Sequence, residues 1–410
     1  MRGATLLLAA CLVAVVVTVL LTVPFPVLPG AHPHVDVARD FTAAQVARER
    51  AYHAAVRPPG YTSLLVGLAF AAVLGLTGIG SRLVGALPGH WIVKAVLGTA
   101  LVLVLGQLVT LPFDVQAERV LRRYGLSTQN WAGWTDDLLR GLALKAGTTA
   151  LVVVVLLALA RRFPATWWAW GALVAALFVV LGSFVYPLVV EPAFNTFTSL
   201  PAGQLRSDLL ALADRDGLRV DDVLVADASR RTTALNAYVS GFGSTRRIVV
   251  YDTLLRSASD REVELVVAHE LGHAKRQDVL HGTIIGAFGA AAGICALYLL
   301  LSSPWLLARA AVPSAGDPRV VPLVLFLGVL APLLLAPLTN LVSRHIEARA
   351  DVHSLELTGD LGTFVASEKR LSTVNLSDLS PSPWVYAMFF THPSGPERIA
   401  LAREWERLHK

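Results

Sequence analysis

The residues best suited to chemistry lie in one short segment, Val266–Lys275, which contains His269, Glu270 and His273. Two histidines four residues apart project from the same face of a helix, so both imidazoles can reach a single Zn²⁺. Glu270 lies beside them but off the row of ligands, close enough to take a proton from a water molecule. Because zinc lowers the pKa of such a water to about 7, this spacing predicts a hydrolytic zinc site.

The surroundings of this pattern matter, because three specified residues within five positions also occur by chance. Apolar residues precede the pattern between Val263 and Ala268, and a long apolar segment follows it. A pair of histidines at a membrane boundary has no packing purpose there, and polar groups near membrane depth are usually functional. The context therefore favours a metal site over a chance match.

A catalytic zinc site needs a third protein ligand and an open fourth position. Metzincins carry a glycine and a third histidine at fixed positions after the second histidine, where this chain has Arg276 and Val279. That class is excluded. Glu347 is the best remaining candidate, and Asp351 shares its helical face and can hydrogen-bond the outer nitrogen of a ligand histidine. The same charges would also suit a solvated helix face, so spacing alone leaves both interpretations open.

Four other side chains compete for the third position: His281, His345, His353 and Glu356. On an unbroken helix, His281 would lie about 12 Å along the axis from His273. A ligand nitrogen must come within about 2.1 Å of zinc, which makes His281 too distant. His345 lies on nearly the opposite face from Glu347, His353 comes six residues after it, and Glu356 lies about 13–14 Å farther along.

The elements that position these residues are mostly membrane helices. Hydrophobic residues make up 54% of the 410 residues and charged residues 16%, and the mean hydropathy is +0.58. Such a surplus of apolar side chains needs lipid to cover it. The net charge of +5 does not indicate a nucleic-acid partner, because the arginines flank apolar runs, where they bias topology and meet acidic lipid. Cys11 and Cys295 lie inside apolar runs and are expected to be small buried hydrophobes.

Seven segments are long and apolar enough to span a bilayer: residues 4–24, 61–80, 91–112, 146–161, 166–188, 281–301 and 319–341. The fourth is short. The first could instead be a signal peptide, but its apolar run is longer than usual and no convincing cleavage site precedes His32, so an uncleaved span is expected.

Loop charges predict the orientation of the chain. Most lysines and arginines lie in residues 25–60, 113–145, 191–280 and the C-terminal tail, whereas the alternate loops carry about two each. Positively charged loops stay in the cytoplasm. With seven spans, we expect the N-terminus outside and the C-terminus and metal residues on the cytoplasmic side, in a bacterial cell membrane.

Residues 191–280 form the only sizeable polar region between spans. We expect a helix at 202–217, strands at 220–226, 237–240 and 247–251, and a hairpin turn at Gly241–Thr245. A further helix begins near Ser259, with Glu262 completing a capping box, and is expected to run on into the sixth span. These elements predict a mainly α-helical polytopic membrane protein with a small α+β metalloprotease unit at the cytoplasmic side.

The expected division of the chain has four parts. Residues 1–190 form an N-terminal bundle of about five spans, and 191–280 form the cytoplasmic catalytic segment. Residues 281–341 add two spans, and 342–410 supply the C-terminal part of the catalytic unit.

Several sequence blocks, taken together and in order, resemble the type I CAAX prenyl endopeptidase family and its bacterial relatives, which are integral-membrane gluzincin zinc metalloproteases. The blocks are His269–His273, Ser343–Asp351, Asn236–Tyr238 with Arg247–Leu254, Thr391–Pro393 with Arg398–Ile399, Pro192–Asn195 with Leu200–Pro201, and Glu118–Asp137. Each block is weak alone, but their shared order and the seven spans make the resemblance specific.

The resemblance implies a role for each residue of the metal site. His269, His273 and Glu347 would bind one Zn²⁺ per chain, and Glu270 would be the general base. Asp351 would support a ligand histidine and is sometimes regarded as a proton donor. The family's spans enclose a large water-filled chamber, with the zinc at its cytoplasmic side.

The resemblance also implies residues that contact substrate. Asn236 would lie near an edge strand that receives the substrate backbone, and His392 and Arg398 would steady the substrate carbonyl or the developing oxyanion. From the residues alone, Asn236 could be a turn residue and His392 ordinary loop chemistry. Asp278-Val-Leu is closer to the bacterial quality-control relatives, so a prenylated substrate does not follow.

The function predicted is peptide-bond hydrolysis, with a peptide or protein substrate at the lipid bilayer. Membrane-associated peptides, misfolded membrane proteins and lipidated C-termini are all open. Two alternatives remain: a non-catalytic membrane scaffold with a zinc site, and a metal transporter. The intact Glu270 argues against the scaffold, since binding alone does not need it. A transporter would place its ligands near the midplane of several spans.

Overall fold

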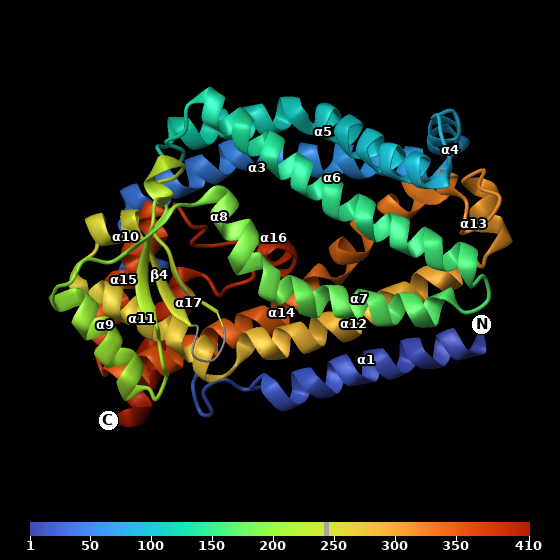
Figure 1. Ribbon diagram of the computed structural model, residues 1–410. Helices are drawn as coiled ribbons and strands as arrows, with labels where there is room; N and C mark the ends of the chain where they lie inside the picture. The colour runs from blue at the N-terminus through green and yellow to red at the C-terminus, as the bar shows by residue number, and fades with distance from the viewer. Residues whose placement is uncertain (242–245) are drawn as a thin grey trace.

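The computed structural model describes residues 1–241 and 246–410. Among these residues, seven helices are long and apolar enough to cross a membrane. They are α1 (Arg2–Thr22), α3 (Ala43–Leu76), α5 (Trp91–Arg123), α6 (Trp131–Arg162), α7 (Trp167–Val185), α12 (Asp278–Leu301) and α14 (Val321–Thr358). Figure 1 shows them running side by side, with the N-terminus and the C-terminus at opposite ends of the molecule.

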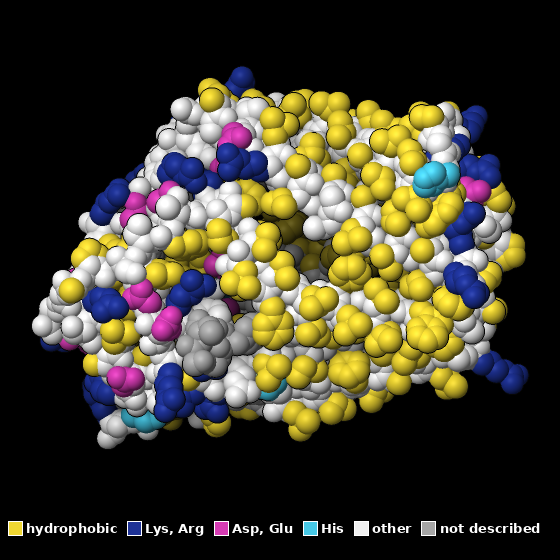
Figure 2. All heavy atoms as spheres, viewed as in Figure 1, with side chains coloured by type: hydrophobic (Ala, Val, Ile, Leu, Met, Phe, Trp, Pro, Cys, Tyr) yellow, Lys and Arg dark blue, Asp and Glu magenta, His cyan; other side chains and the backbone are white. Residues whose placement is uncertain are grey.

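The surface of these helices is the kind that lipid covers. Large apolar side chains such as Leu6, Leu21, Leu181 and Leu334 are exposed. In Figure 2 hydrophobic side chains cover the long helices, whereas charged side chains gather toward the two ends. An apolar surface this extensive does not stay in water. The prediction of seven spans is therefore confirmed.

Several helices are longer than the predicted spans. α3 begins at Ala43 rather than at residue 61, although Pro58 and Pro59 lie inside it. α5 extends to Arg123 and α6 already begins at Trp131, so the connection predicted at 113–145 is reduced to residues 124–130. Hydropathy detects only the part of a helix that lies in lipid. It therefore did not predict the turns by which these helices extend beyond the bilayer.

Short helices connect or follow the spans. α2 (Val37–Asp40), α4 (Gly78–Gly85) and α13 (Pro304–Arg309) lie between them, and a π-helical turn (Tyr186–Val190) joins α7 to α8 (Glu191–Phe194).

A four-stranded sheet forms the centre of the catalytic unit. Its strands are β1 (Phe197–Ser199), β2 (Asp222–Ala226), β3 (Ala237–Ser240) and β4 (Arg247–Tyr251). The spatial order is β1-β2-β4-β3, so β1 and β3 are the edges. β2 and β4 are parallel and the other pairs antiparallel. The three predicted strands are confirmed, whereas β1 was not predicted. The predicted hairpin turn covers Gly241–Thr245, and its residues 242–245 lie outside the described part of the chain.

Helices pack around this sheet at one end of the molecule (Figure 1). They are α9 (Gln204–Arg215), α10 (Asp252–Ser257), α11 (Asp260–Lys275), α15 (Leu361–Val374), α16 (Pro383–Phe389) and α17 (Gly395–His409). Leu209, Leu212, Ile248, Val267 and Leu271 share one core between the sheet, α9 and α11 and are almost fully buried. Burying a leucine stabilises a fold by roughly 1.5–3 kcal/mol, so this core holds α11 firmly against the sheet.

The expectation that α11 continues into the sixth span is wrong. α11 ends at Lys275, and α12 begins at Asp278. Between them Gln277 adopts a left-handed backbone conformation, with φ of 55°, which a continuous right-handed helix cannot contain. The break turns the chain so that Asp278 comes beside His273.

Candidate metal centre

The histidines lie on α11, whose start is defined by the capping box predicted from sequence. The Ser259 hydroxyl accepts from the backbone N–H of Glu262, and the Glu262 carboxylate accepts from the backbone N–H of Ser259. Such a cap satisfies two otherwise free donors of the first turn. Two turns later the helix is enclosed by the core, and His269 is buried while His273 is half-buried.

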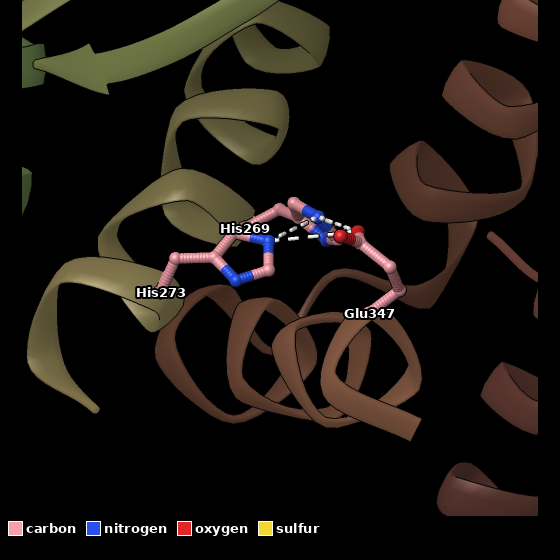
Figure 3. A group of neighbouring side chains, drawn as sticks. All are labelled: His269, His273 and Glu347. Carbon is pink, nitrogen blue, oxygen red and sulfur yellow. Dashed lines mark hydrogen bonds and ion pairs between the residues drawn. The ribbon is translucent and has the colours of Figure 1, made fainter. Parts of the chain in front are cut away.

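The third candidate ligand comes from α14, which packs against α11. The two helices approach closely at Gly272, where a Cβ atom would lie 3.0 Å from the His353 ring. A contact that tight would push the His353 ring away by a few tenths of an ångström, so glycine allows the closest packing of the two helices. The close approach lets Glu347 extend toward the histidines from the opposite side, and Figure 3 shows both imidazoles pointing at its carboxylate.

The three donor atoms are spaced as a tetrahedral metal requires. Nε2 of His269 lies 3.2 Å from Nε2 of His273 and 3.2 Å from Oε2 of Glu347. Nε2 of His273 lies 3.5 Å from the same oxygen. With zinc–ligand bonds of about 2.0–2.1 Å, tetrahedral ligand atoms lie about 3.3 Å apart. The residues present therefore fit a metal ion of this kind.

Each histidine is oriented by a carboxylate on its other nitrogen. Nδ1 of His269 lies 2.9 Å from Asp351, and Nδ1 of His273 lies 2.9 Å from Asp278. An ionised carboxylate only accepts hydrogen bonds, so in the neutral ring Nδ1 carries the proton, which leaves the lone pair of Nε2 for a metal.

The charges around the imidazoles favour a cation at this point. Burial lowers the pKa of both rings, but hydrogen bonds to carboxylates outweigh burial, raising the pKa of His269 to about 10 and of His273 to about 9. A site that attracts protons this strongly also attracts a metal cation, which would replace them.

Sequence reasoning missed Asp278 and its partner Arg349 as site residues. The Arg349 guanidinium hydrogen-bonds Asp278 and also donates to the Thr22 carbonyl at the end of α1, at 2.6 Å. A chain of contacts thus links α1 to His273. The sequence places Asp278 five residues after His273. On an unbroken helix, side chains five residues apart do not face each other, so this spacing did not predict a contact between Asp278 and His273.

Glu270 faces the cavity of the site without a partner among the described residues. The cavity has a volume of about 500 Å³ and is also lined by Asn236, His269, His392 and Arg398. Burial raises the pKa of the Glu270 carboxyl, although positive charge on the histidines opposes this. A carboxylate with a raised pKa and free oxygens is suited to accept a proton from water.

Arg398 lies deep in the site and is already paired. Its Nε donates to Asp351 at 2.8 Å, and its Nη1 lies 2.8 Å from Glu368. Its Nη2 also contacts Asp351 and lies 3.4 Å from Nδ1 of His269. These contacts place Arg398 behind His269, where it neutralises two carboxylates. Glu368 was not anticipated from sequence.

His392 and Asn236 lie at the mouth of the same cavity. Nε2 of His392 lies 3.2 Å from Oε2 of Glu347, and 58% of its side chain is exposed. Asn236 directly precedes the edge strand β3, and its side-chain oxygen accepts from the backbone N–H of Ala237 at 2.9 Å. Both predicted substrate residues are therefore within the cavity that contains Glu270.

The competing ligand candidates have other surroundings. His353 lies 3.1 Å from Asp216, and His345 donates to the Leu341 carbonyl at 2.9 Å. Glu356 is exposed, and His281 has a buried Nδ1 with no hydrogen-bond partner among the described residues. None of them belongs to the cluster of His269, His273 and Glu347.

Comparisons with known proteins agree with this site. Residues 199–406 match the model of peptidase family M48, and residues 32–196 match that of the CAAX prenyl protease N-terminal region, described as five membrane helices. An uncharacterized metalloprotease of Bacillus subtilis, YhfN, is 32% identical over 73% of this chain and 71% of its own. CAAX prenyl protease 1 of Saccharomyces cerevisiae is 29% identical over 72% of this chain and 69% of its own.

The fold agrees as well. The crystal structure of S. mikatae Ste24p superimposes with a TM-score of 0.80, covering 97% of this chain and 98% of that one at 21% identity. Two family models, in order, and a relative above 30% identity leave no other assignment. The chain belongs to peptidase family M48 and is a membrane-embedded metalloendopeptidase.

Proposed function

We propose that this protein is a zinc-dependent endopeptidase of the bacterial cell membrane, with one Zn²⁺ held by His269, His273 and Glu347. The proposal rests on one observation: three donor atoms from two helices lie at the spacing of tetrahedral ligands, beside the unpartnered Glu270. Membership of a peptidase family favours this function over a scaffold or a transporter. The free carboxylate of Glu270 favours it too, since neither a scaffold nor a transporter needs a free carboxylate next to the metal ligands.

Glu270 is the group that moves protons in this proposal. A bound Zn²⁺ would polarise the scissile carbonyl and make water nucleophilic near neutral pH. Glu270 accepts the proton of the attacking water and then passes it to the leaving amine. Asp351 and Asp278 hold the two imidazoles in the tautomer that presents Nε2, and Arg398 keeps Asp351 ionised beside His269.

Asn236 and β3 would receive the substrate. β3 is an edge strand that pairs with β4 on one side, and an extended peptide can hydrogen-bond to the backbone of such an edge. His392, with its exposed ring near Glu347, is placed to donate to the oxygen of the scissile carbonyl as negative charge develops there.

The substrates we propose are peptides and protein segments held at the membrane. The yeast relative is named a CAAX prenyl protease, so a C-terminal lipidated peptide is one candidate class. Extracted segments of misfolded membrane proteins are the other. A matched pair of peptides, with and without a C-terminal lipid, separates the two classes by their kcat/KM values.

The metal content of purified protein tests the proposal directly. We expect about one zinc per chain, loss of peptidase activity when a chelator removes it, and recovery when zinc is restored. Full activity of metal-depleted protein would exclude the proposed function.

The orientation of the chain gives a further prediction. A reporter that is active only in the cytoplasm should work when fused after Lys410, and should fail when inserted near Pro313, between α13 and α14. The C-terminus and α13, which ends shortly before Pro313, lie at opposite ends of the molecule (Figure 1). Activity at Pro313 and silence after Lys410 would put the site outside the cell.

Asp278→Asn should weaken zinc binding about 10–100-fold, as expected when the carboxylate behind a ligand histidine is lost. Asparagine keeps the shape but donates as readily as it accepts, so His273 is no longer held in one tautomer. Competition with a zinc chelator measures the dissociation constant. Asp136→Asn is the control, because that carboxylate pairs with Arg140 at an exposed position. Equal zinc affinity in both variants would remove Asp278 from the site.

A further inference from the structure

A second cavity lies between α5 and α6 and shares no lining residue with the cavity of the candidate metal centre. It has a volume of about 510 Å³. Most of its lining is apolar, with Val104, Leu108, Leu111, Val115, Leu138, Leu139 and Leu142 along its walls. Leu108 and Leu139 are more than half exposed, so the cavity is a groove open on the side that faces lipid.

One end of this groove is basic and aromatic. Arg119 lines it together with Trp131 and Trp134, whose rings meet edge to face at 5.6 Å. Arg119 is exposed and has no ion pair or hydrogen bond with any described residue. The Arg122 guanidinium stacks 3.9 Å above the Trp131 ring, and its Nη2 is buried without a hydrogen-bond partner in the described part of the chain.

The nearby acidic groups form no ion pair with Arg119. Glu118 is paired with Arg122, Asp136 with Arg140 and Asp137 with Arg231. Asp114 instead accepts hydrogen bonds from the uncharged side chains of Ser63, Gln107 and Thr110. In Figure 2 a group of basic side chains lies at the end of α5 and α6 nearest the catalytic unit, next to the hydrophobic surface of the spans. The groove therefore combines a long apolar wall with an exposed, unpaired arginine at one end.

The length of the groove matches one leaflet of a bilayer. From Val104 to Arg119 along α5 the helix rises about 22 Å. One leaflet, including its headgroups, is about 20–22 Å deep. Tryptophans mark the interface between lipid and water, which places Trp131, Trp134 and Arg119 at headgroup level with the apolar walls beneath them.

We propose that the α5/α6 groove binds an acidic phospholipid of the surrounding bilayer, with an acyl chain along Val104–Val115 and the phosphate at Arg119. Basic pockets between membrane helices select acidic headgroups in this way. A zwitterionic lipid would fill the same apolar walls, but its positive choline or ethanolamine would gain nothing from Arg119. This site lies beyond the proposed proteolytic function and does not depend on it.

Brominated lipids test the proposal, because bromine quenches the fluorescence of nearby tryptophans. Purified full-length protein in detergent is titrated with phosphatidylglycerol or with phosphatidylcholine brominated on the acyl chains. The quenching that comes from the groove is the difference between the unaltered protein and the Trp131→Phe/Trp134→Phe double variant, which lacks both tryptophans of the groove. We expect phosphatidylglycerol to bind more tightly, and Arg119→Gln to weaken it about fivefold, the effect of one arginine near acidic lipid.

Two controls keep the outcome specific. Arg123→Gln removes an exposed arginine on the same helix that does not line the groove, and it should leave the selectivity unchanged. Leu111→Phe should narrow the groove without adding a fluorophore and reduce quenching by both lipids, while peptidase activity shows that the chain is folded. Equal affinity for the two lipids, or equal losses in Arg119→Gln and Arg123→Gln, would overturn the proposal. Displacement of phosphatidylglycerol by an uncharged isoprenoid alcohol at equal potency would also overturn it, in favour of a lipidated substrate.

Discussion

Glu270→Gln should reduce kcat for peptide hydrolysis by about 10²–10⁴-fold, the usual contribution of a general base. Glutamine has nearly the same shape as glutamate but cannot accept the proton of the attacking water. Glu270 has no hydrogen-bond partner among the described residues, so its replacement breaks no contact in the fold. We therefore expect the variant to be fully folded and inactive.

Zinc content separates this effect from damage to the site. Because Glu270 is not one of the three clustered donors, Glu270→Gln should bind zinc as the unaltered protein does, measured by elemental analysis. Its unfolding temperature should be unchanged or higher, since the variant no longer carries a half-buried carboxylate whose pKa burial raises. Near-normal cleavage by the variant would end the proposed mechanism.

Glu347→Ala should lose most of its bound zinc and all measurable activity. Its Oε2 atom lies within 3.5 Å of Nε2 of both histidines, and two imidazoles alone give an incomplete site. Removing the carboxylate also leaves the positive charge of a bound ion less compensated. Zinc per chain after dialysis against a weak chelator, together with kcat/KM, measures both effects.

Two variants on the same helix serve as controls. Glu356→Ala removes an exposed carboxylate of α14, and His345→Ala removes a ring whose hydrogen bond goes to the Leu341 carbonyl. Both should keep zinc and activity. If Glu347→Ala retained one zinc per chain while His345→Ala lost it, the assignment of the third ligand would be wrong.

Asp351 differs from these residues because it contacts His269 and Arg398 at once. Asp351→Asn should weaken zinc binding or activity about 10–100-fold. It is fully buried, so the change also leaves Arg398 with one fewer carboxylate. The unfolding temperature of the variant should therefore be compared with that of Asp278→Asn, where the lost carboxylate is less deeply buried.

Local patterns in the sequence were enough for the spans and for α11. A run of about 20 apolar residues spans lipid whatever surrounds it, and seven such runs became seven helices. The four-residue spacing of His269 and His273 places both on one face because the geometry of a helix is local. The capping box of Ser259 and Glu262 depends only on residues three apart, and the structure forms it.

Contacts between distant segments were decided by tertiary structure. Spacing alone did not decide whether Glu347 is a metal ligand or a solvated charge on the helix surface. Glu347 lies 74 positions after His273, and no local rule spans that distance. The packing of α14 on α11 at Gly272 brings its carboxylate to the histidines. Likewise, only the fold shows that the Arg398 guanidinium is paired with the carboxylates of Asp351 and Glu368.

Composition and local spacing therefore predicted the type of protein, the number of spans and a pair of histidines on one helical face, since each depends on composition or on residues within one or two helical turns. The tertiary structure decided how the site is completed. A left-handed Gln277 breaks the helix after His273 and brings Asp278 back to the His273 ring, while Arg349 connects that carboxylate to the end of α1. A periodic pattern assumes an unbroken helix, so a contact created by a break in that helix cannot be read from periodicity.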